Sequence, residues 1–460
     1  MILLKNCFYI ATFNAAGDEL RDHDILIRDN LIAEVAPSIR LTPQDEESTE
    51  VIDCSRLLVM PGMVNTHHHL YQILTRNLPG AQNAKLFDWL VYLYPIWANL
   101  DEEGVYYSTL IGAAELLKTG ATCTTDHMYL YPAGFKGDMM ALQFQAANEV
   151  GIRFSPSRGS MTLGQSQGGL PPDHVVQTTD EVLRDMARTA ETYHDPDPLA
   201  MRKVTFAPCS PFSVESSVMT ETAKLARDYG VVLHTHLVET LDEEEYCLAR
   251  YGKRPLALMA DWDWLGPDVY YAHGIWFNDE ELDLLQETGT GIAHCPSSNM
   301  RLGSGIARVT EMVARGVRVG LGVDGSASND SSDMLGEVRN ALLLQRVRYG
   351  ADALSARQAL SMAIDGGLRL LNFRERLGAI SPGMGADLAL FDMGKMQYAG
   401  ALSDPLAALI FCGYDHQTAY TIVNGKVVVR QGRLVAFDED ELAQHVNTIA
   451  AKLLAASTIC

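Results

Sequence analysis

Basic residues are scarce in this chain of 460 residues. It has 36 Lys and Arg against 58 Asp and Glu, so the formal net charge is −22 and the pI is about 4.9. Nucleic acids and anionic membranes bind basic surfaces. We therefore expect neither as a partner, whereas an uncharged heterocycle such as a free nucleobase is compatible with this charge.

Paired cysteine motifs and long apolar runs are also missing. The eight cysteines are scattered and form no Cys-X-X-Cys motif, which is typical of reduced thiols in the cytosol. No apolar run reaches the length needed to span a membrane. The N-terminus soon meets Asp18, Glu19 and Asp22, which predicts no secretory leader. We expect a cytoplasmic protein.

Both ends of the chain are rich in short strand-like segments. Residues 1–58 and residues 376–440 share this texture, and Asn424-Gly425 predicts a tight hairpin turn. We expect one small β-sandwich domain built from both segments. An amphipathic pattern from residue 439 onward predicts a closing helix, which we delimit as residues 441–460.

The middle of the chain, residues 59–375, alternates strand-like and helix-like segments. Such alternation is typical of a parallel sheet, and eight units over about 320 residues match a (β/α)8 TIM-like barrel. In such barrels function lies at the carboxyl ends of the strands. The predicted strands end near His69, His127, Arg158, Cys209, His236, His273, His294 and Asp324.

One apolar strand ends in a histidine cluster. Residues 57–64 are mostly apolar, and His67, His68 and His69 follow closely. Side chains two apart on a strand share a face, so His67 and His69 can hold one metal ion while His68 points away. Alone, this pattern also suits surface or packed polar histidines. Three later strands with matching ligand types at their ends favour the metal site.

A second strand supplies another ligand and an acid–base group. The apolar run from Val231 ends at His236, and Glu239 follows three residues later. This spacing suits His236 as a third metal ligand and Glu239 as a proton shuttle beside the metal. His234 shares the face of His236 one layer deeper, where we expect a supporting or packed histidine rather than a ligand.

Two further strands end in titratable residues. His273 closes an aromatic strand and suits either a satisfied core histidine or a group that activates water beside the metal. Asp324 ends the last strand, where its carboxylate can bind a cation and accept a proton. With His67, His69 and His236 it makes a set of three nitrogens and one oxygen, suited to one Zn²⁺ ion or, alternatively, Fe²⁺.

These motifs resemble the amidohydrolase superfamily and, within it, the cytosine/guanine deaminase-like branch. The resemblance rests on residues 61–69, 236–239, 272–273, 294–299 and 323–325. It implies one divalent metal per chain, held by His67, His69, His236 and Asp324, with Glu239, His273 and Asp324 catalytic. The binuclear branch uses a carbamylated lysine on the fourth strand, whereas that strand ends here in Cys209.

Other stretches narrow the resemblance to a substrate class. Residues 158–164, 168–173, 207–213 and 325–330 resemble 8-oxoguanine deaminases, hydroxyatrazine hydrolases share part of this set, and isoxanthopterin deaminases share less. The resemblance implies hydrolytic deamination of an aminopurine, with 8-oxoguanine giving uric acid and ammonia. The alternative is another amino-substituted heterocycle: a triazine, isoxanthopterin, isocytosine or guanine. The resemblance also implies a homo-oligomer.

A third hypothesis is a catalytically silent binding protein on this scaffold. Every predicted ligand and Glu239 are retained, which argues against it, because a buried acid–base cluster is costly to keep without chemistry.

Several further residues are candidates for the pocket. Gln72 lies three residues beyond His69, where its amide suits either a ring carbonyl and adjacent N–H or a structural role in the loop. Cys209 faces the barrel mouth and suits either a substrate contact or a small buried apolar group. We expect His127, Arg158, His294 and Asn329 to line or brace the pocket.

The first loop of the barrel, residues 70–100, is long and aromatic. One interpretation is a packed cover over the barrel mouth, and the other is a wall that stacks on a flat substrate. The two interpretations are compatible.

Overall fold

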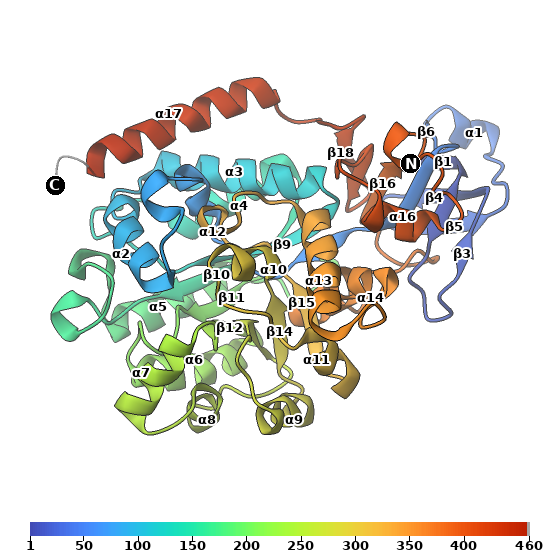
Figure 1. The fold of residues 1–460 in the computed structure, drawn as a ribbon. Helices are drawn as coiled ribbons and strands as arrows, with labels where there is room; N and C mark the ends of the chain where they lie inside the picture. Colours follow the sequence, from blue (N-terminus) through green and yellow to red (C-terminus); the bar gives the residue numbers. More distant parts are fainter. Residues whose placement is uncertain (458–460) are drawn as a thin grey trace.

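Eight parallel strands close into a barrel in the computed structural model, which describes residues 1–457 (Figure 1). Their order around the barrel is β10-β11-β12-β13-β14-β15-β8-β9. The strands are β8 (Met63–Asn65), β9 (Ala121–Met128), β10 (Arg153–Ser160), β11 (Thr205–Pro208), β12 (Val232–Leu237), β13 (Val269–His273), β14 (Gly291–His294) and β15 (Arg318–Leu321). The predicted (β/α)8 barrel is confirmed.

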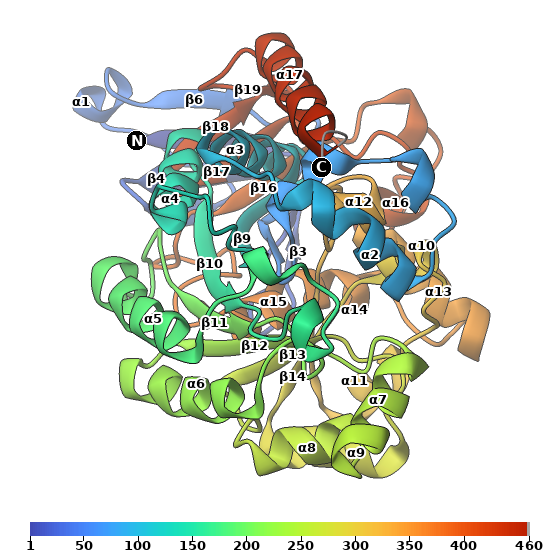
Figure 2. The ribbon, with the colours of Figure 1, turned by 90° about the vertical axis from the view of Figure 1, so that its left-hand side faces the viewer.

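Helices surround the barrel on its outer side, as Figure 2 shows for α5, α6, α8 and α9. The long connecting helices are α3 (Glu102–Lys118), α4 (Met139–Val150), α5 (Thr179–Tyr193), α6 (Ser216–Tyr229), α7 (Leu241–Tyr251), α8 (Pro255–Asp261), α9 (Asp279–Thr288), α11 (Val309–Arg315) and α13 (Met334–Tyr349). Local sequence sets their ends. Asp101 caps α3 by accepting the N–H of Gly104, and Gly151 and Gly230 end α4 and α6 in the left-handed region.

Shorter helical segments decorate this framework. They are α1 (Pro43–Glu46), η1 (Leu70–Thr75), η2 (Pro79–Ala81), α2 (Leu86–Trp97), η3 (Gln165–Gln167), η4 (Asp173–Val175), α10 (Pro296–Arg301), α12 (Ser326–Asn329), α14 (Ala356–Ser361), η5 (Met362–Gly366), α15 (Gly367–Leu370), η6 (Met396–Tyr398) and α16 (Pro405–Phe411). Among the described residues, no helix is both long and apolar enough to cross a membrane. The segments η1, η2 and α2 all belong to the predicted aromatic loop.

Two further sheets come from the chain ends. The first is β5-β4-β1-β6, with β1 (Ile2–Cys7), β4 (His23–Arg28), β5 (Leu31–Ala36) and β6 (Glu50–Asp53). The second is β19-β18-β17-β16-β7-β2-β3, with β2 (Tyr9–Ala11), β3 (Glu19–Leu20), β7 (Leu57–Pro61), β16 (Leu388–Asp392), β17 (Tyr420–Val423), β18 (Lys426–Arg430) and β19 (Arg433–Leu434). These sheets agree with the predicted β-sandwich.

The two chain ends meet inside the larger sheet. β7 pairs antiparallel with β16, and Val59 lies opposite Leu390. Residues of both ends share one apolar core that includes Ile25 and Ile422. Asn424 and Gly425 form the predicted turn between β17 and β18, both with positive φ. The domain boundaries at residues 58 and 376 stay a prediction.

The last helix, α17 (Glu439–Ser457), lies along α3 (Figure 1). Its first turn is tied to α3 by an ion pair between Glu439 and Lys118, and Lys452 pairs with Asp101 at 2.7 Å. The predicted helix therefore exists. Its predicted end at residues 458–460 lies outside the described residues.

Candidate active site

Four side chains converge where β8, β12 and β15 end at one mouth of the barrel. His69 Nε2 lies 3.1 Å from His236 Nε2 and 3.3 Å from Asp324 Oδ1. His67 Nε2 lies 3.4 Å from the same carboxylate oxygen. The structure thus brings together the four residues predicted as metal ligands.

The opposite nitrogens of these rings show which tautomer each histidine adopts. His69 Nδ1 lies 2.8 Å from the carbonyl oxygen of His127, and His236 Nδ1 lies 2.6 Å from that of Cys209. A carbonyl only accepts, so both Nδ1 atoms carry the proton and both Nε2 atoms expose a lone pair. Two lone pairs at 3.1 Å beside a carboxylate repel each other unless a cation lies between them.

His67 reaches the same state through a deeper histidine. His234 Nδ1 donates to the carbonyl oxygen of Tyr270 at 3.1 Å, so its Nε2 accepts a proton from His67 Nδ1 at 2.7 Å. This leaves the lone pair of His67 Nε2 free, and that atom has no hydrogen-bond partner in the described part of the chain. His234 therefore supports a ligand from below, which agrees with its prediction.

Charge favours a cation at this point. Burial lowers the pKa of His67, His69 and His236, so the three imidazoles are neutral near pH 7. Burial opposes ionisation of Asp324, but the adjacent rings of His67, His273 and His69 outweigh this and hold the pKa of the carboxyl well below its usual range. Three neutral imidazoles and one carboxylate are a suitable donor set for a divalent metal.

Glu239 and His273 flank the same carboxylate. His273 Nε2 lies 3.5 Å from Glu239 Oε2 and 4.0 Å from Asp324 Oδ2. Burial raises the pKa of Glu239. Burial opposes protonation of His273, yet the two carboxylates and the Asn299 side chain, which accepts from Nδ1 at 2.9 Å, give a raised pKa. The cluster therefore places two acid–base groups beside the residues predicted as metal ligands.

Backbone conformation aims these side chains. Val238, His273 and Asp324 all have φ between 56° and 72°, a left-handed conformation that is rare for residues other than glycine. Each lies just at or beyond the end of a barrel strand. Strained residues of this kind cluster at functional sites, where the surrounding structure holds them in place.

The family model named Amidohydrolase family matches residues 58–428. The chain belongs to the amidohydrolase family. It is 46% identical over 88% of its length to 8-oxoguanine deaminase of Pseudomonas aeruginosa, covering 89% of that protein. It is 38% identical to hydroxydechloroatrazine ethylaminohydrolase of a Pseudomonas species, with 97% of this chain and 94% of that protein covered.

Solved structures agree with this assignment. Atrazine chlorohydrolase TrzN of Arthrobacter aurescens, complexed with zinc, superposes with a TM-score of 0.92 at 30% identity, covering 98% of this chain and 100% of that one. This amidohydrolase is thus a hydrolase that acts on C–N bonds, as its deaminase relatives do. Its His/Asp cluster is a metal-binding site.

A small cavity opens onto the cluster of this amidohydrolase. It is lined by His69, Gln72, Leu86, Trp89, Leu90, Tyr94, Tyr129, Cys209, Phe212, His236, Glu239, His273, Leu302, Asp324 and Ser328. Both substrate-contact candidates, Gln72 and Cys209, belong to this wall. Burial raises the pKa of Cys209 to about 12, so its thiol stays protonated and is a poor nucleophile.

The aromatic loop serves as both cover and wall. Trp89 and Tyr94 of α2 line the cavity, while Tyr71 and Trp97 pack behind them with ring centroids 5.2 Å apart. Trp89 Nε1 donates to the carbonyl oxygen of Ala327 at 3.3 Å, which ties α2 to α12.

Three of the four bracing candidates lie near the site. His127 stacks on His236 with centroids 4.6 Å apart, and its Nε2 donates to the carbonyl of Ala207. His294 is fully buried. Asn329 donates to the carbonyl oxygen of Val323, next to Asp324.

Arg158 differs from these three. Its guanidinium pairs with Asp185 on α5 and donates to Gln177, so it lies between β10 and the outer helix and does not line the cavity. Strand-end position alone was not enough, because alternate side chains on a strand face opposite sides.

Sequence reasoning missed four lining residues: Tyr129, Phe212, Leu302 and Ser328. Tyr129 could have been predicted, because it lies two residues after His127 and its side chain therefore points to the same face of the strand. Phe212 and Leu302 come from irregular segments after β11 and α10, which carry no periodic pattern.

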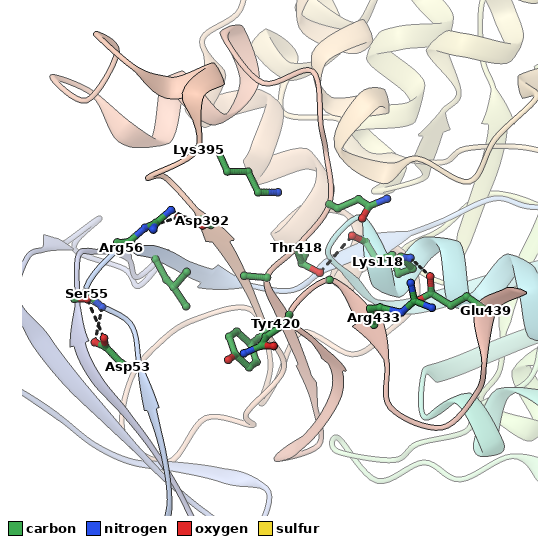
Figure 3. Close-up of a pocket in the computed structure, with 15 residues that line it drawn as sticks. Asp53, Ser55, Arg56, Lys118, Asp392, Lys395, Thr418, Tyr420, Arg433 and Glu439 are labelled. Atoms are coloured by element: carbon green, nitrogen blue, oxygen red, sulfur yellow. Dashed lines mark hydrogen bonds and ion pairs between the residues drawn. The ribbon is translucent and has the colours of Figure 1, made fainter.

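A larger cavity, of about 700 Å³, lies elsewhere, between the terminal sheets, α3 and α17 (Figure 3). Its charged groups are largely paired with one another. Arg56 pairs with Asp392 at 2.8 Å, and Lys118 pairs with Glu439. We assign no catalytic role to this cavity, because most of the charged side chains that line it are already in ion pairs.

A buried carboxyl below the His69 loop gives a test of stability. Asp126 accepts the N–H of Leu70 at 2.6 Å and the amide of Gln143, and burial raises its pKa to about 7. The folded protein therefore binds this proton between the ordinary pKa of 3.8 and about 7. The stability that this proton contributes is fully present below pH 4 and is lost as the pH rises through 7.

We expect Asp126→Asn to raise the melting temperature most at pH 9 and by less at pH 5, where only part of the stability that this proton contributes has been lost. Asn cannot ionise, and Gln143 can rotate its amide to keep the hydrogen bond. The difference at pH 9 is up to about 4 kcal/mol, at about 1.4 kcal/mol per pKa unit. Melting at pH 5, 7 and 9 would check this, with the exposed Asp180→Asn as control. A variant no more stable than the parent at pH 9 would contradict it.

Proposed function

We propose that this protein is a metal-dependent aminohydrolase that converts 8-oxoguanine and water to uric acid and ammonia. The observation that carries the proposal is the meeting of Glu239, His273 and Asp324 around a histidine cluster at the base of a small aromatic cavity. The 46% identity to 8-oxoguanine deaminase supports the choice of substrate.

The ion in this proposal is zinc, held by His67, His69, His236 and Asp324. The donor set suits Zn²⁺, with Fe²⁺ as the alternative, and a structural relative at 30% identity was solved with zinc. Bound at this position, a divalent cation supplies Lewis acidity and makes water acidic near neutral pH.

Protons move among three side chains in this mechanism. Asp324, ionised and facing the ligands, accepts a proton from the attacking water. Glu239, whose pKa is raised by burial, delivers a proton to the ring nitrogen beside the attacked carbon, which makes that carbon electrophilic. His273 lies near both carboxylates and, with Asp324, holds the attacking water. Asp324 then returns its proton to the amino group, which leaves as ammonia. The hydroxyl added from water gives its proton to Glu239 as the carbonyl of the product forms, so both carboxyl groups regain their starting state.

Gln72 and Cys209 contact the substrate in this proposal. The Gln72 side chain is buried, and its Oε1 has no hydrogen-bond partner among residues 1–457. A buried amide oxygen without a hydrogen-bond partner costs free energy. A ring N–H of the substrate would supply the missing hydrogen bond. Gly325 makes room for this amide, because a Cβ at that position would lie 1.9 Å from Gln72 Oε1. Cys209 would meet the 8-oxo edge.

We expect Gln72→Ala to raise KM about 10-fold and to leave the metal content unchanged. The variant loses one buried hydrogen bond to the substrate, worth on the order of 1.5 kcal/mol. Steady-state kinetics and metal analysis would check this, with Gln82→Ala on the same loop as control, since Gln82 is exposed. An unchanged KM would show that Gln72 has a structural role in the loop and does not contact the substrate.

A second candidate is hydrolysis of another amino-substituted heterocycle. The 38% identity to hydroxydechloroatrazine ethylaminohydrolase favours a triazine, and isoxanthopterin, isocytosine and guanine complete the set. The partners in either case are small uncharged molecules, in keeping with the net charge of −22. A homo-oligomer in the cytoplasm completes the proposal.

Parallel assays distinguish these substrates. Purified, zinc-loaded protein is offered 8-oxoguanine, guanine, isocytosine, isoxanthopterin and hydroxyatrazine, and release of ammonia or alkylamine is measured. Fast ammonia release with uric acid from 8-oxoguanine alone is the expected result. Faster turnover of another compound would favour the second candidate function, hydrolysis of that heterocycle. No release from any compound, with metal bound, would favour a silent binding protein.

A further inference from the structure

Helix α7 begins with a sequence pattern that predicts a capping box. Thr240 precedes the helix and Glu243 occupies its third position, the arrangement in which each side chain hydrogen-bonds the other residue's backbone N–H. Three helices in the described part of the chain form such a box completely: α5 with Thr178 and Glu181, α9 with Asn278 and Glu281, and α14 with Ser355 and Gln358.

Helix α7 does not form the box. Thr240 makes no capping hydrogen bond, and its Oγ1 has no partner within the described chain. Glu243 is only 1% exposed, and its Oε2 accepts the N–H of Glu239 at 3.1 Å. The other carboxylate oxygen, Oε1, has no hydrogen-bond partner among the described residues. The capping glutamate is thus used one residue earlier than in a capping box, on the segment that carries the proposed proton shuttle.

That segment is a strained turn held from two sides. Val238 is β-branched and has φ of 56°, a genuine outlier for such a residue. Its carbonyl oxygen accepts the N–H of Ile275 at 2.9 Å and of Trp276 at 3.3 Å, while the N–H of the next residue, Glu239, donates to Glu243. A conformation of this kind persists only where surrounding groups hold it.

The turn decides where the Glu239 carboxylate lies. Glu239 directly follows Val238, and its Oε2 reaches to 3.5 Å from His273 Nε2. If Val238 relaxed to negative φ, the direction of the chain would change and Glu239 would leave the cluster. Glu243 itself contacts no predicted metal ligand and does not line the cavity.

We infer that Glu243 is a positioning residue for Glu239: by accepting the backbone N–H of Glu239, it holds the proton shuttle beside the histidine cluster. This inference rests on the proposed role of Glu239. Burial raises the pKa of Glu243 to about 7, and the N–H of Glu239 favours its ionised form.

The test compares four variants with the parent in the zinc-loaded enzyme. Glu243→Ala removes the acceptor, and we expect kcat to fall 10- to 100-fold, with KM and metal content within 3-fold of the parent. Glu243→Gln keeps a carbonyl acceptor of the same length and should retain most of kcat. Glu243→Asp is too short to reach the turn and should resemble Ala; it serves the same purpose if Ala fails to fold.

Glu281→Ala is the matched control. Glu281 is also a buried glutamate at the third position of a helix, but it serves only its own capping box and Arg254. We expect Glu281→Ala to lower the melting temperature and leave kcat within 2-fold. A kcat within 2-fold in both Glu243→Ala and Glu243→Asp, or an equal loss in Glu281→Ala, would overturn the inference.

A readout independent of turnover separates this inference from the proposed function. Amide hydrogen exchange of a peptide covering residues 236–240 should speed up at least 10-fold in Glu243→Asp and not in Glu281→Ala. If the parent deaminates none of the test compounds, the proposed function fails, and the exchange result alone decides whether Glu243 holds the turn. Unchanged exchange would overturn the inference in that case too.

Discussion

Glu239→Gln is expected to bind metal as the parent does and to lose most of its turnover, by about 10²- to 10⁴-fold in kcat. Glutamine has nearly the shape of a protonated glutamic acid, but it cannot deliver a proton to the substrate ring. Glu239 is not among the four converging ligands, so the metal site should survive the change. Metal analysis and steady-state kinetics on 8-oxoguanine would measure both quantities.

A matched control excludes a general effect of removing a buried carboxylate. Glu281→Gln changes the same residue type at a buried site on the helix after the next strand, away from the cavity. We expect that control to keep kcat within 2-fold of the parent. Near-parental turnover in Glu239→Gln would remove Glu239 from the mechanism, whereas simultaneous loss of metal would show that it supports the ligand cluster instead.

Removal of the metal should abolish activity and lower the melting temperature. Without a cation, the lone pairs of His69 and His236 face each other at 3.1 Å beside the Asp324 carboxylate, and this repulsion is stored in the folded state. A ligand that binds only the folded protein also stabilises it by mass action. We expect a chelator to reduce turnover at least about 10³-fold and Zn²⁺ to restore it.

Two variants locate the metal. His236→Ala removes one of the converging nitrogens and should reduce the bound metal to well below one ion per chain. His174→Ala changes an exposed histidine in the loop after β10 and should keep one ion and full turnover. Full activity of metal-free protein would refute the metal site, and a second ion of equal affinity would refute the mononuclear one.

Much of the site could be predicted because its signals are local. His67 and His69 follow an apolar strand with a spacing of two, which alone places them on one face. His236 with Glu239, and Asp324, also stand directly at strand ends, where a parallel barrel gathers its chemistry.

Arg158 shows where a local signal was not enough. It lies near the end of β10, yet its guanidinium pairs with Asp185 on an outer helix. Whether the side chain of a residue near the end of a strand points into the barrel depends on the register of that strand with its neighbours. That register is set by closure of the whole barrel and not by the sequence around one residue.

The sequence by itself determined the barrel, the four converging residues predicted as metal ligands and the order in which they occur, because periodicity and strand ends are properties of neighbouring residues. Only the tertiary structure decided how Phe212, Leu302 and the aromatic loop close the cavity. It also decided that Glu243 holds the turn of Glu239 rather than capping its own helix. These contacts join segments that lie on different loops, and their geometry exists only once the eight strands have closed and the left-handed turns are held in place.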